Sequence, residues 1–300
     1  MKRPVNLDID HLAVWTKANG ECAYNTVQVA SMHALAELHG KLPERWGGAP
    51  YGPGVSSRKW DWAYGKGGSP EKFLGALEGG DKRAAASIHK LAKDMAKEVK
   101  LHGVLPEPEP CVAGGPVVVA AALAGTPLAF NRSVYREDST STLRIFIPIG
   151  AKAAISTSDL RKAMVAQLAL AVSLSAARPV QLEAYAGEHV YSGAIGHRQV
   201  LIRIPIGMTP IDWGMVAALS QPGMFRDLIF KLCSWGSLHN KGSELDNLRC
   251  DIPSRRDLGA EPGDLLLTRG DIDNAAYNGV EWVKEQIAKV NQAADEQPQP

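Results

Sequence analysis

The sequence predicts an α/β protein with a mostly parallel central sheet, helices on both faces of that sheet, and a preceding helical, loop-rich N-terminal part. Three observations support this fold class. Residues 143–149, 180–186 and 200–206 are strand-like apolar runs. Residues 156–177, which follow the first run, predict a helix so apolar that it must be covered on most sides. Strands that alternate with helices are typical of a parallel sheet covered on both faces.

The N-terminal part contains one helical run and then a segment of turns. Residues 27–38 have apolar side chains at helical spacing, and Gly40 favours the end of that helix. Residues 43–70, named the aromatic loop below, are rich in glycine and proline and predict turns. Large aromatic side chains in this loop need a surface on which to bury their area; they are Trp46, Tyr51, Trp60, Trp62 and Tyr64.

Two helices should follow the aromatic loop. Ser69 and Pro70 predict the start of the first, because serine is a favoured N-cap and proline fits the first turn. We expect it to run to about Leu77. Asp81 predicts the cap of the second, residues 82–102. Its exposed face is basic and partly balanced by carboxylates, which favours a solvated face over a nucleic-acid stripe; the residues are Lys90, Lys93, Lys97, Lys100, Asp94 and Glu98.

A proline-rich segment, residues 106–116, predicts a stiff linker. It divides the chain into an N-terminal region, residues 1–105, and an α/β domain, residues 117–292. Residues 293–300 predict a disordered tail, because they are polar and end in alternating glutamine and proline.

The second half carries further signals of regular structure. Ser156 with Asp159 resembles a capping box at the start of the apolar helix. Residues 213–219 and 225–235 predict helices. Residues 264–268 predict a late strand, and residues 280–290 a closing amphipathic helix.

Composition limits the function classes. The chain has 300 residues, 45% hydrophobic and 22% charged, and a net charge of +1, so no global charge favours nucleic acid or an anionic membrane. No run approaches the length of a membrane-spanning helix, and the N-terminus does not resemble a secretory signal. The four cysteines, Cys22, Cys111, Cys233 and Cys250, are too widely separated for a metal motif and favour reduced thiols in the cytoplasm.

Several polar groups could carry chemistry, but each has a simpler structural interpretation. Glu188 with His189 and His197 could bind a metal, although exposed hairpin residues are the favoured interpretation. Asp271 and Asp273 follow the late strand and could bind a cation, although helix capping explains them as well. In the polar segment after Trp235, a hydrolase could use Ser237, His239, Asp246 and Asp251, although no nucleophile elbow is present. We therefore expect no catalytic residue, no metal ligand and no cofactor.

The aromatic loop is the favoured partner-binding surface, because basic residues alternate with its aromatic residues. Such side chains can anchor a protein interface, stack on single-stranded nucleic acid, or pack on the protein's own core. All three interpretations remain open. The candidate partner-binding residues are Trp46, Arg58, Lys59, Trp60, Trp62 and Tyr64.

The order of strand 143–149, helix 156–177, strand 180–186 and then a near hairpin to 200–206 resembles the opening of a von Willebrand factor type A domain. That family places an Asp-x-Ser-x-Ser motif after its first strand, where oxygen atoms help to hold Mg²⁺. The matching positions here are Pro148, Gly150 and Lys152. The resemblance therefore implies a type-A-like domain without a working metal site.

A second set of motifs covers residues 46 to about 182. Trp60, Ser69, and the segments 113–116, 123–128 and 175–180 together resemble a family of bacteriophage proteins of unknown function. This resemblance implies an origin in a phage or mobile element, and it implies no activity.

These observations favour a non-enzymatic, cytoplasmic protein of a bacteriophage or mobile element that binds another protein as an adaptor or assembly component, and that could form an oligomer. One alternative is a nucleic-acid-associated protein that uses Arg58 to Lys66 and the basic helix face. A second alternative is a hydrolase that uses residues 237–251.

Overall fold

The computed structural model describes fourteen stretches of the chain, and the helices and strands below lie within them. These are residues 9–18, 24–42, 63–98, 107–111, 123, 130–134, 142–149, 155–175, 179–192, 196–208, 212–229, 231–233, 247–251 and 253–295.

Nine strands are present in these stretches. They are β1 (Ala13–Thr16), β2 (Asn25–Val29), β3 (Glu107–Cys111), β4 (Phe130–Val134), β5 (Leu143–Pro148), β6 (Val180–Ser192), β7 (Gly196–Met208), β8 (Asn247–Asp251) and β9 (Leu265–Leu266). Seven of them form one sheet with the path β1-β2-β7-β6-β5-β9, and β8 pairs with β6 beyond the end of β5. β3 and β4 form a separate antiparallel pair.

The central sheet is mixed. The pairs β2–β7, β5–β6 and β5–β9 are parallel, whereas β1–β2, β6–β7 and β6–β8 are antiparallel. The α/β class is therefore confirmed, but the expected dominance of parallel pairing is reduced. The main cause is the hairpin of β6 and β7, two 13-residue strands that extend well beyond the predicted 180–186 and 200–206.

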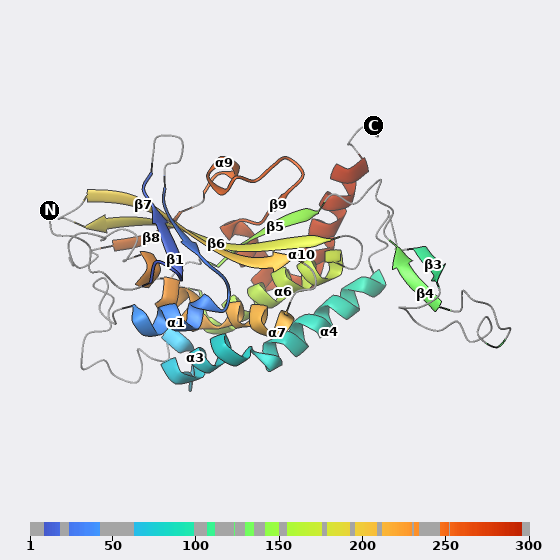
Figure 1. Ribbon diagram of the computed structural model, residues 1–300, viewed down its shortest axis with the longest axis horizontal. Helices are drawn as coiled ribbons and strands as arrows, with labels where there is room; N and C mark the ends of the chain where they lie inside the picture. The colour runs from blue at the N-terminus through green and yellow to red at the C-terminus, as the bar shows by residue number, and fades with distance from the viewer. Residues whose placement is uncertain are drawn as a thin grey trace.

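The helices of the described residues form a layer on one side of the sheet (Figure 1). They are α1 (Ala34–Lys41), α3 (Pro70–Gly79), α4 (Lys82–Glu98), α6 (Thr157–Ser175), α7 (Trp213–Val216) and α10 (Arg269–Asp295), with the short 3-10 helix η1 (Ala217–Ser220) and the π-helix η2 (Met224–Ile229). The four-residue α9 (Arg255–Leu258) lies on the other side of the sheet.

The main core lies between this helical layer and one face of the sheet. Alternate strand residues point into it, among them Val27, Ile145, Leu182 and Ile202, all at most 1% exposed. α6 is buried over most of its surface, as its apolar composition predicts, because it packs against both α4 and α10.

Within the described residues, the second face is covered by no helix other than the four-residue α9, so the expectation of helices on both faces holds only in small part. On the second face, the only helical residue of the apolar cluster is Leu258 of α9, which packs with Tyr24, Phe146, Tyr185 and Leu201. The physical reason is the alternation of side chains along the strands. Glu183 and Arg203 occupy the second face and would lose hydration under a full helical layer.

The N-terminal part is also less helical than expected. Residues 25–29 form β2 within the predicted helix 27–38, and α1 begins only at Ala34. β2 pairs in parallel with β7, so residues before the predicted linker complete the same sheet as residues after it. The buried Val27 alternates with the half-buried Thr26 and Gln28 at period 2, and pairing with a distant strand outweighs the local helical spacing.

Several predicted helix ends are confirmed. The Ser69 side chain accepts a hydrogen bond from Lys72 N at the start of α3, and Asp81 accepts one from Ala84 N at the start of α4. At the start of α6, Ser156 Oγ accepts from Asp159 N and donates to the Asp159 carboxylate. These local hydrogen bonds satisfy backbone donors that a helix leaves unpaired.

The predicted linker and tail are only partly described. Glu107–Cys111 forms β3, which is extended as its prolines predict, and residues 112–116 lie outside the described residues. α10 continues to Asp295, three residues into the predicted tail, and residues 296–300 also lie outside. Among the described helices, none has the length and apolarity needed to cross a membrane.

Candidate functional site

The second face of the sheet carries a polar surface. Its side chains alternate with residues of the main core and therefore point away from the helical layer. We name this surface the polar sheet face and define it by Val14, Thr26, Gln28, Arg144, Glu183 and Arg203. Val14 is 57% exposed, and the other five are half-buried.

Register aligns these residues across four strands. Val14 of β1 lies opposite Gln28 of β2, and Gln28 lies opposite Arg203 of β7. Arg203 reaches Glu183 on β6, whose carboxylate oxygens lie 2.5 Å from Arg203 Nε and 2.9 Å from Arg203 Nη2. Such a two-bond pair fixes the guanidinium in one orientation. The result is a continuous row from the edge strand to the middle of the sheet.

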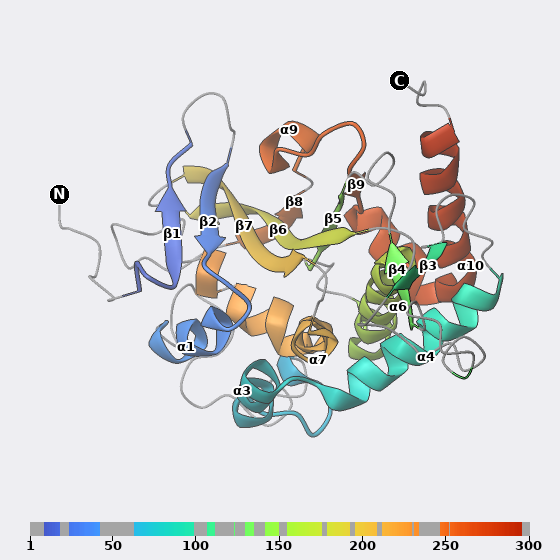
Figure 2. The ribbon, with the colours of Figure 1, turned by 45° about the vertical axis from the view of Figure 1, so that its right-hand side comes forward.

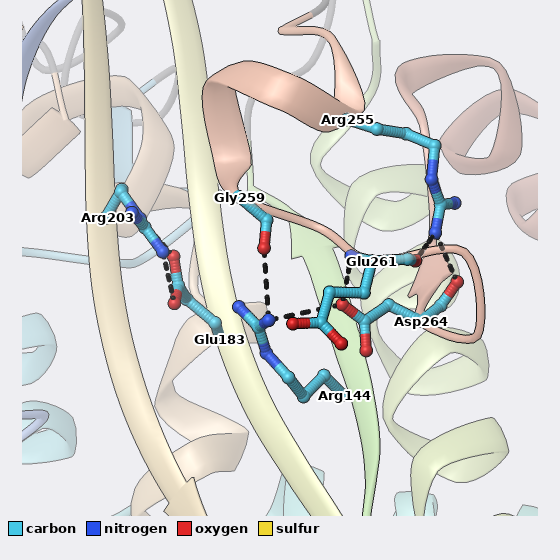
Figure 3. Close-up of polar contacts among 7 residues, drawn as sticks. All are labelled: Arg144, Glu183, Arg203, Arg255, Gly259, Glu261 and Asp264. Atoms are coloured by element: carbon cyan, nitrogen blue, oxygen red, sulfur yellow. Dashed lines mark hydrogen bonds and ion pairs between the residues drawn. The ribbon is translucent and has the colours of Figure 1, made fainter.

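Arg144 closes one end of the polar sheet face (Figure 3). Its Nη1 donates to Gly259 O at 3.1 Å and lies 3.3 Å from Asp264 Oδ2, while its guanidinium carbon lies 4.9 Å from the centre of the Phe146 ring. The stacking and the ion pair hold Arg144 against the segment that follows α9.

Hydrogen bonds within the segment that follows α9 stabilise its conformation. Arg255 donates to the carbonyl oxygens of Glu261 and Asp264, and Glu261 N donates to Asp264 Oδ2 at 2.7 Å (Figure 3). Gly259 ends α9 with φ +61, a left-handed backbone conformation that favours glycine. The Asp264 carboxylate therefore joins the loop to β5 through Arg144.

Tyr185, a buried side chain of β6, packs with Leu258 of α9. Its hydroxyl donates to Leu267 O at 2.6 Å, which ties β6 to the segment between β9 and α10. Burial raises the pKa of Tyr185, and the nearby charge of Asp271 raises it further. Tyr185 is therefore a neutral hydrogen-bond donor here.

A second polar group is buried within the helical layer. Asp227 Oδ2 lies 2.6 Å from His39 Nε2 and 2.5 Å from the Tyr64 hydroxyl, and its Oδ1 lies 3.3 Å from Lys231 Nζ. We name these four residues the Asp227 network. Burial by itself would raise the pKa of Asp227, but the hydrogen bond from His39, the charge of Lys231 and the hydrogen bond from Tyr64 outweigh it and lower that pKa.

The Asp227 network joins three separate parts of the chain. His39 comes from α1, Tyr64 from the end of the aromatic loop, and Asp227 from η2. The Phe73 ring of α3 contacts both His39 and Tyr64, with ring centres 5.4 Å and 5.9 Å away. The Asp227 carboxylate is bound by His39, Tyr64 and Lys231, so its arrangement is that of a group which holds parts of the structure together.

The π-helix η2 also supplies Arg226, which is 2% exposed. Its guanidinium donates to Thr157 Oγ1 at 3.1 Å and to Ile155 O, at the start of α6. The wider turn of a π-helix changes the spacing of its side chains, and such turns are frequent at functional sites. Here Arg226 and Asp227 point to different neighbours, which locks η2 to both α6 and α1.

The predicted partner-binding residues are only partly described. Trp46, Arg58, Lys59, Trp60 and Trp62 lie outside the described residues. Tyr64 is half-buried and donates its hydroxyl to Asp227, so its side chain is engaged within the protein. The role of the other five residues stays a prediction.

The predicted empty metal position lies at the carboxyl end of β5. Pro148 is buried there, and Gly150 and Lys152 lie outside the described residues. Asp271 lies near the same edge, after the parallel strand β9. Its Oδ2 accepts from Thr268 N and Oγ1, and its Oδ1 accepts from Trp282 Nε1 at 3.1 Å. Asp271 therefore stabilises the start of α10 from within its first turn, since the helix begins at Arg269, and it is not itself the residue that caps the helix.

The other predicted candidates have separate outcomes. Glu188 is fully buried inside β6, so the interpretation as an exposed hairpin residue is wrong; the hairpin continues to Ser192 before it turns. The side chains of His189 and His197 are not among those described. Ser237, His239 and Asp246 lie outside the described residues, and only the backbone of Asp251, in β8, is described.

Sequence reasoning missed the Asp227 network and the ion pairs of the polar sheet face. For the sheet face a signal exists, because Glu183 and Arg203 sit at alternating positions within apolar runs. For the network, Asp227 and Lys231 are four residues apart, which predicts a helical ion pair. Neither pattern predicts that His39 joins them.

A family model described as a domain of unknown function (DUF7192) matches residues 49–280. The chain belongs to this family. The match contains α3 through the first part of α10, and on the C-terminal side it extends beyond the predicted stretch of resemblance, residues 46 to 182. No curated protein and no solved structure matches the chain.

Proposed function

We propose that this chain is a non-enzymatic protein-binding protein of a bacteriophage or mobile element, which acts as an adaptor or assembly component in the cytoplasm of the host cell. The observation that carries the proposal is the aligned row of Val14, Gln28 and Arg203 on the polar sheet face. In this proposal, the partner protein docks on that face.

The chemistry of the row suits a protein partner. Val14 offers exposed apolar area, and Gln28 offers both a donor and an acceptor. Arg203 is already paired with Glu183, so covering it leaves no unpaired charge. Arginine and apolar side chains with few free charges are typical of the centre of a protein interface.

The edge position of β1 supports the same proposal. Within the described residues β1 pairs with β2 alone, and its residues continue the row. A partner could therefore contact the face and the sheet edge together. The aromatic loop would supply a second set of contacts through Trp60 and Trp62.

The order β7-β6-β5-β9, with β6 and β7 antiparallel, supports the proposed likeness to a von Willebrand factor type A domain. We propose that this domain uses no Mg²⁺, since Pro148, the last residue of β5, stands where that family has a ligand. A melting temperature that rises with Mg²⁺ concentration would contradict this part, because a ligand of the native state must stabilise it.

The test is affinity purification from the host, identification of the captured protein, and reconstitution of the complex from purified components. The variant Val14→Asp should weaken the reconstituted complex at least tenfold, because it places an unpaired charge in the interface. The matched control is Val280→Asp, on the exposed side of α10, which should bind as the unaltered protein does.

Trp60→Ala and Trp62→Ala test the aromatic loop separately. A stable complex that survives Val14→Asp but is lost with either tryptophan variant would move the interface to the loop. Equal binding by all variants would refute both surfaces.

A further inference from the structure

α4 presents a second surface, which the proposed function does not use. One side of the helix is held in the main core by Ile88 and Ala92, which are 0% and 4% exposed. Figure 2 shows α4 along the outer side of the helical layer, and α6 lies against it. α4 is therefore held in place by its buried side, and its other side is exposed to solvent.

The solvent side of α4 is basic. Lys82, Arg83, Lys90 and Lys93 are all exposed. At 3.6 residues per turn these four positions fall within an arc of about 100°, and Ile88 lies on the opposite side of the helix. We name these four residues the basic face of α4. Between Lys82 and Lys93 the face extends about 16 Å along the axis.

These cations are not neutralised within the part of the chain that the structure describes. No ion pair there involves any of the four, and Lys90 forms none with Asp94, which lies four residues further along α4. Asp81, near the start of α4, instead accepts from Ala84 N and from Gln221, whose Oε1 accepts from the exposed Arg161. Arg161 thus adds a further cation near the start of the basic face.

The structure around the basic face of α4 argues against two classes of anionic partner, a membrane surface and a single-stranded nucleic acid. A helix that inserts into a membrane surface needs a free apolar side, but the apolar side of α4 is already buried in the core. Binding of single strands needs several exposed aromatic rings for base stacking. Between the cations, the described part of α4 exposes a single ring, that of His89, and this ring lies edge-on to the Trp213 ring. A rigid row of cations instead fits the regular phosphates of a duplex.

We propose that the basic face of α4 binds the phosphate backbone of a nucleic-acid duplex without reading its bases. A net charge of only +1 for the whole chain means that this attraction is local to the face. Phosphate contacts of this kind position a protein on a duplex and carry no sequence information. Binding should therefore be weak at physiological salt and steeply salt-dependent.

The test uses the full chain and a fluorescent 24-base-pair DNA duplex of arbitrary sequence, titrated between 50 and 200 mM salt. The variant pair Lys90→Gln with Lys93→Gln should flatten the slope of log K against log salt by about 1.8, because each lost phosphate contact removes about 0.9. The matched control, Lys162→Gln with Lys284→Gln, removes the same charge from α6 and α10 and should leave the slope unchanged.

Every other outcome is decisive. Absence of binding at 50 mM salt, or equal slopes for the two variant pairs, would overturn the proposal. Binding to phosphatidylserine vesicles but not to the duplex would assign the face to a membrane instead. Tighter binding to a single strand than to the duplex would also contradict it. Lys90, Lys93 and Lys162 are exposed, and Lys284 is half-buried beside the exposed Glu281, so none of the four lies in the core and thermal unfolding should be nearly unchanged in both variants.

Discussion

His39 Nε2 and Asp227 Oδ2 lie 2.6 Å apart although 188 residues separate them in the chain. The bond joins α1, next to the N-terminal strands, to η2, which also holds the start of α6 through Arg226. At that distance Nε2 carries a proton and donates it to the carboxylate. The Asp227 network thus fixes the orientation of α1 relative to η2, which apolar packing alone would not determine.

Asp227→Ala should lower the free energy of unfolding by about 3–5 kcal/mol. The substitution leaves Lys231 buried without its carboxylate and removes the acceptor of His39 and Tyr64. Urea unfolding measures the change. The matched control is Glu281→Ala, which removes an exposed pair with Lys284 and should cost at most about 1 kcal/mol. Equal effects of the two variants would show that the Asp227 network adds nothing to stability.

Acid should weaken the fold through the same carboxylate. The pKa of Asp227 in the folded chain lies below its ordinary 3.8. Ionised Asp227 therefore stabilises the fold above that ordinary value, and the contribution is lost as the pH falls through the lower, folded pKa. Unfolding midpoints recorded between pH 6 and pH 2 should fall more steeply below pH 4 for the unaltered chain than for Asp227→Asn. Parallel curves would contradict the assignment.

Tyr185→Phe should lower the free energy of unfolding by about 1–2 kcal/mol, because Leu267 O loses a buried donor. It should also alter the response to alkali. Since the folded pKa of Tyr185 is raised above 10.0, the unfolded chain ionises first, and stability falls as the pH rises above about 10. The Phe variant should lose this part of the alkaline decline. Denaturant unfolding at pH 8 and pH 11 separates the two effects.

Gly80→Ala should destabilise the chain by more than about 1 kcal/mol. Gly80 has φ +77, and an added Cβ would lie 2.8 Å from Gly214 O at the start of α7. Gly75 offers a contrast, because it is exposed in α3 and an added Cβ meets nothing within 4 Å. Gly75→Ala should therefore stabilise by about 0.5–1 kcal/mol. Melting temperatures that move in the same direction for both variants would refute this reasoning.

Local signals predicted local features correctly. Ser69 and Asp81 cap their helices because a short side chain can reach a backbone donor within the next turn, whatever the rest of the chain does. The apolar run 180–186 predicted a strand, and β6 does begin at Val180. The apolar composition of α6 likewise predicted its deep burial, and eleven of its residues are buried.

Pairings between distant segments were beyond local signals. Residues 27–29 have helical spacing but form β2, because a place beside β7 buries Val27 and Val29 completely. On the second face, α9 and the loop after it lie where a layer of helices was expected. Arg144 holds that loop in place through Gly259 and Asp264, which lie more than a hundred residues away in the chain. The spacing of residues in the sequence does not predict which distant segments will pair.

The sequence by itself determined the α/β class, the helix caps, the alternation that makes one sheet face polar, and the basic stripe along α4, since each depends on neighbours within a few turns of chain. Only the tertiary structure decided which face the helices cover, how β1 and β2 extend the sheet, and that His39, Tyr64, Asp227 and Lys231 meet. These depend on contacts between segments far apart in the chain, whose free energy comes from burial and from pairing of groups that local sequence cannot match to one another.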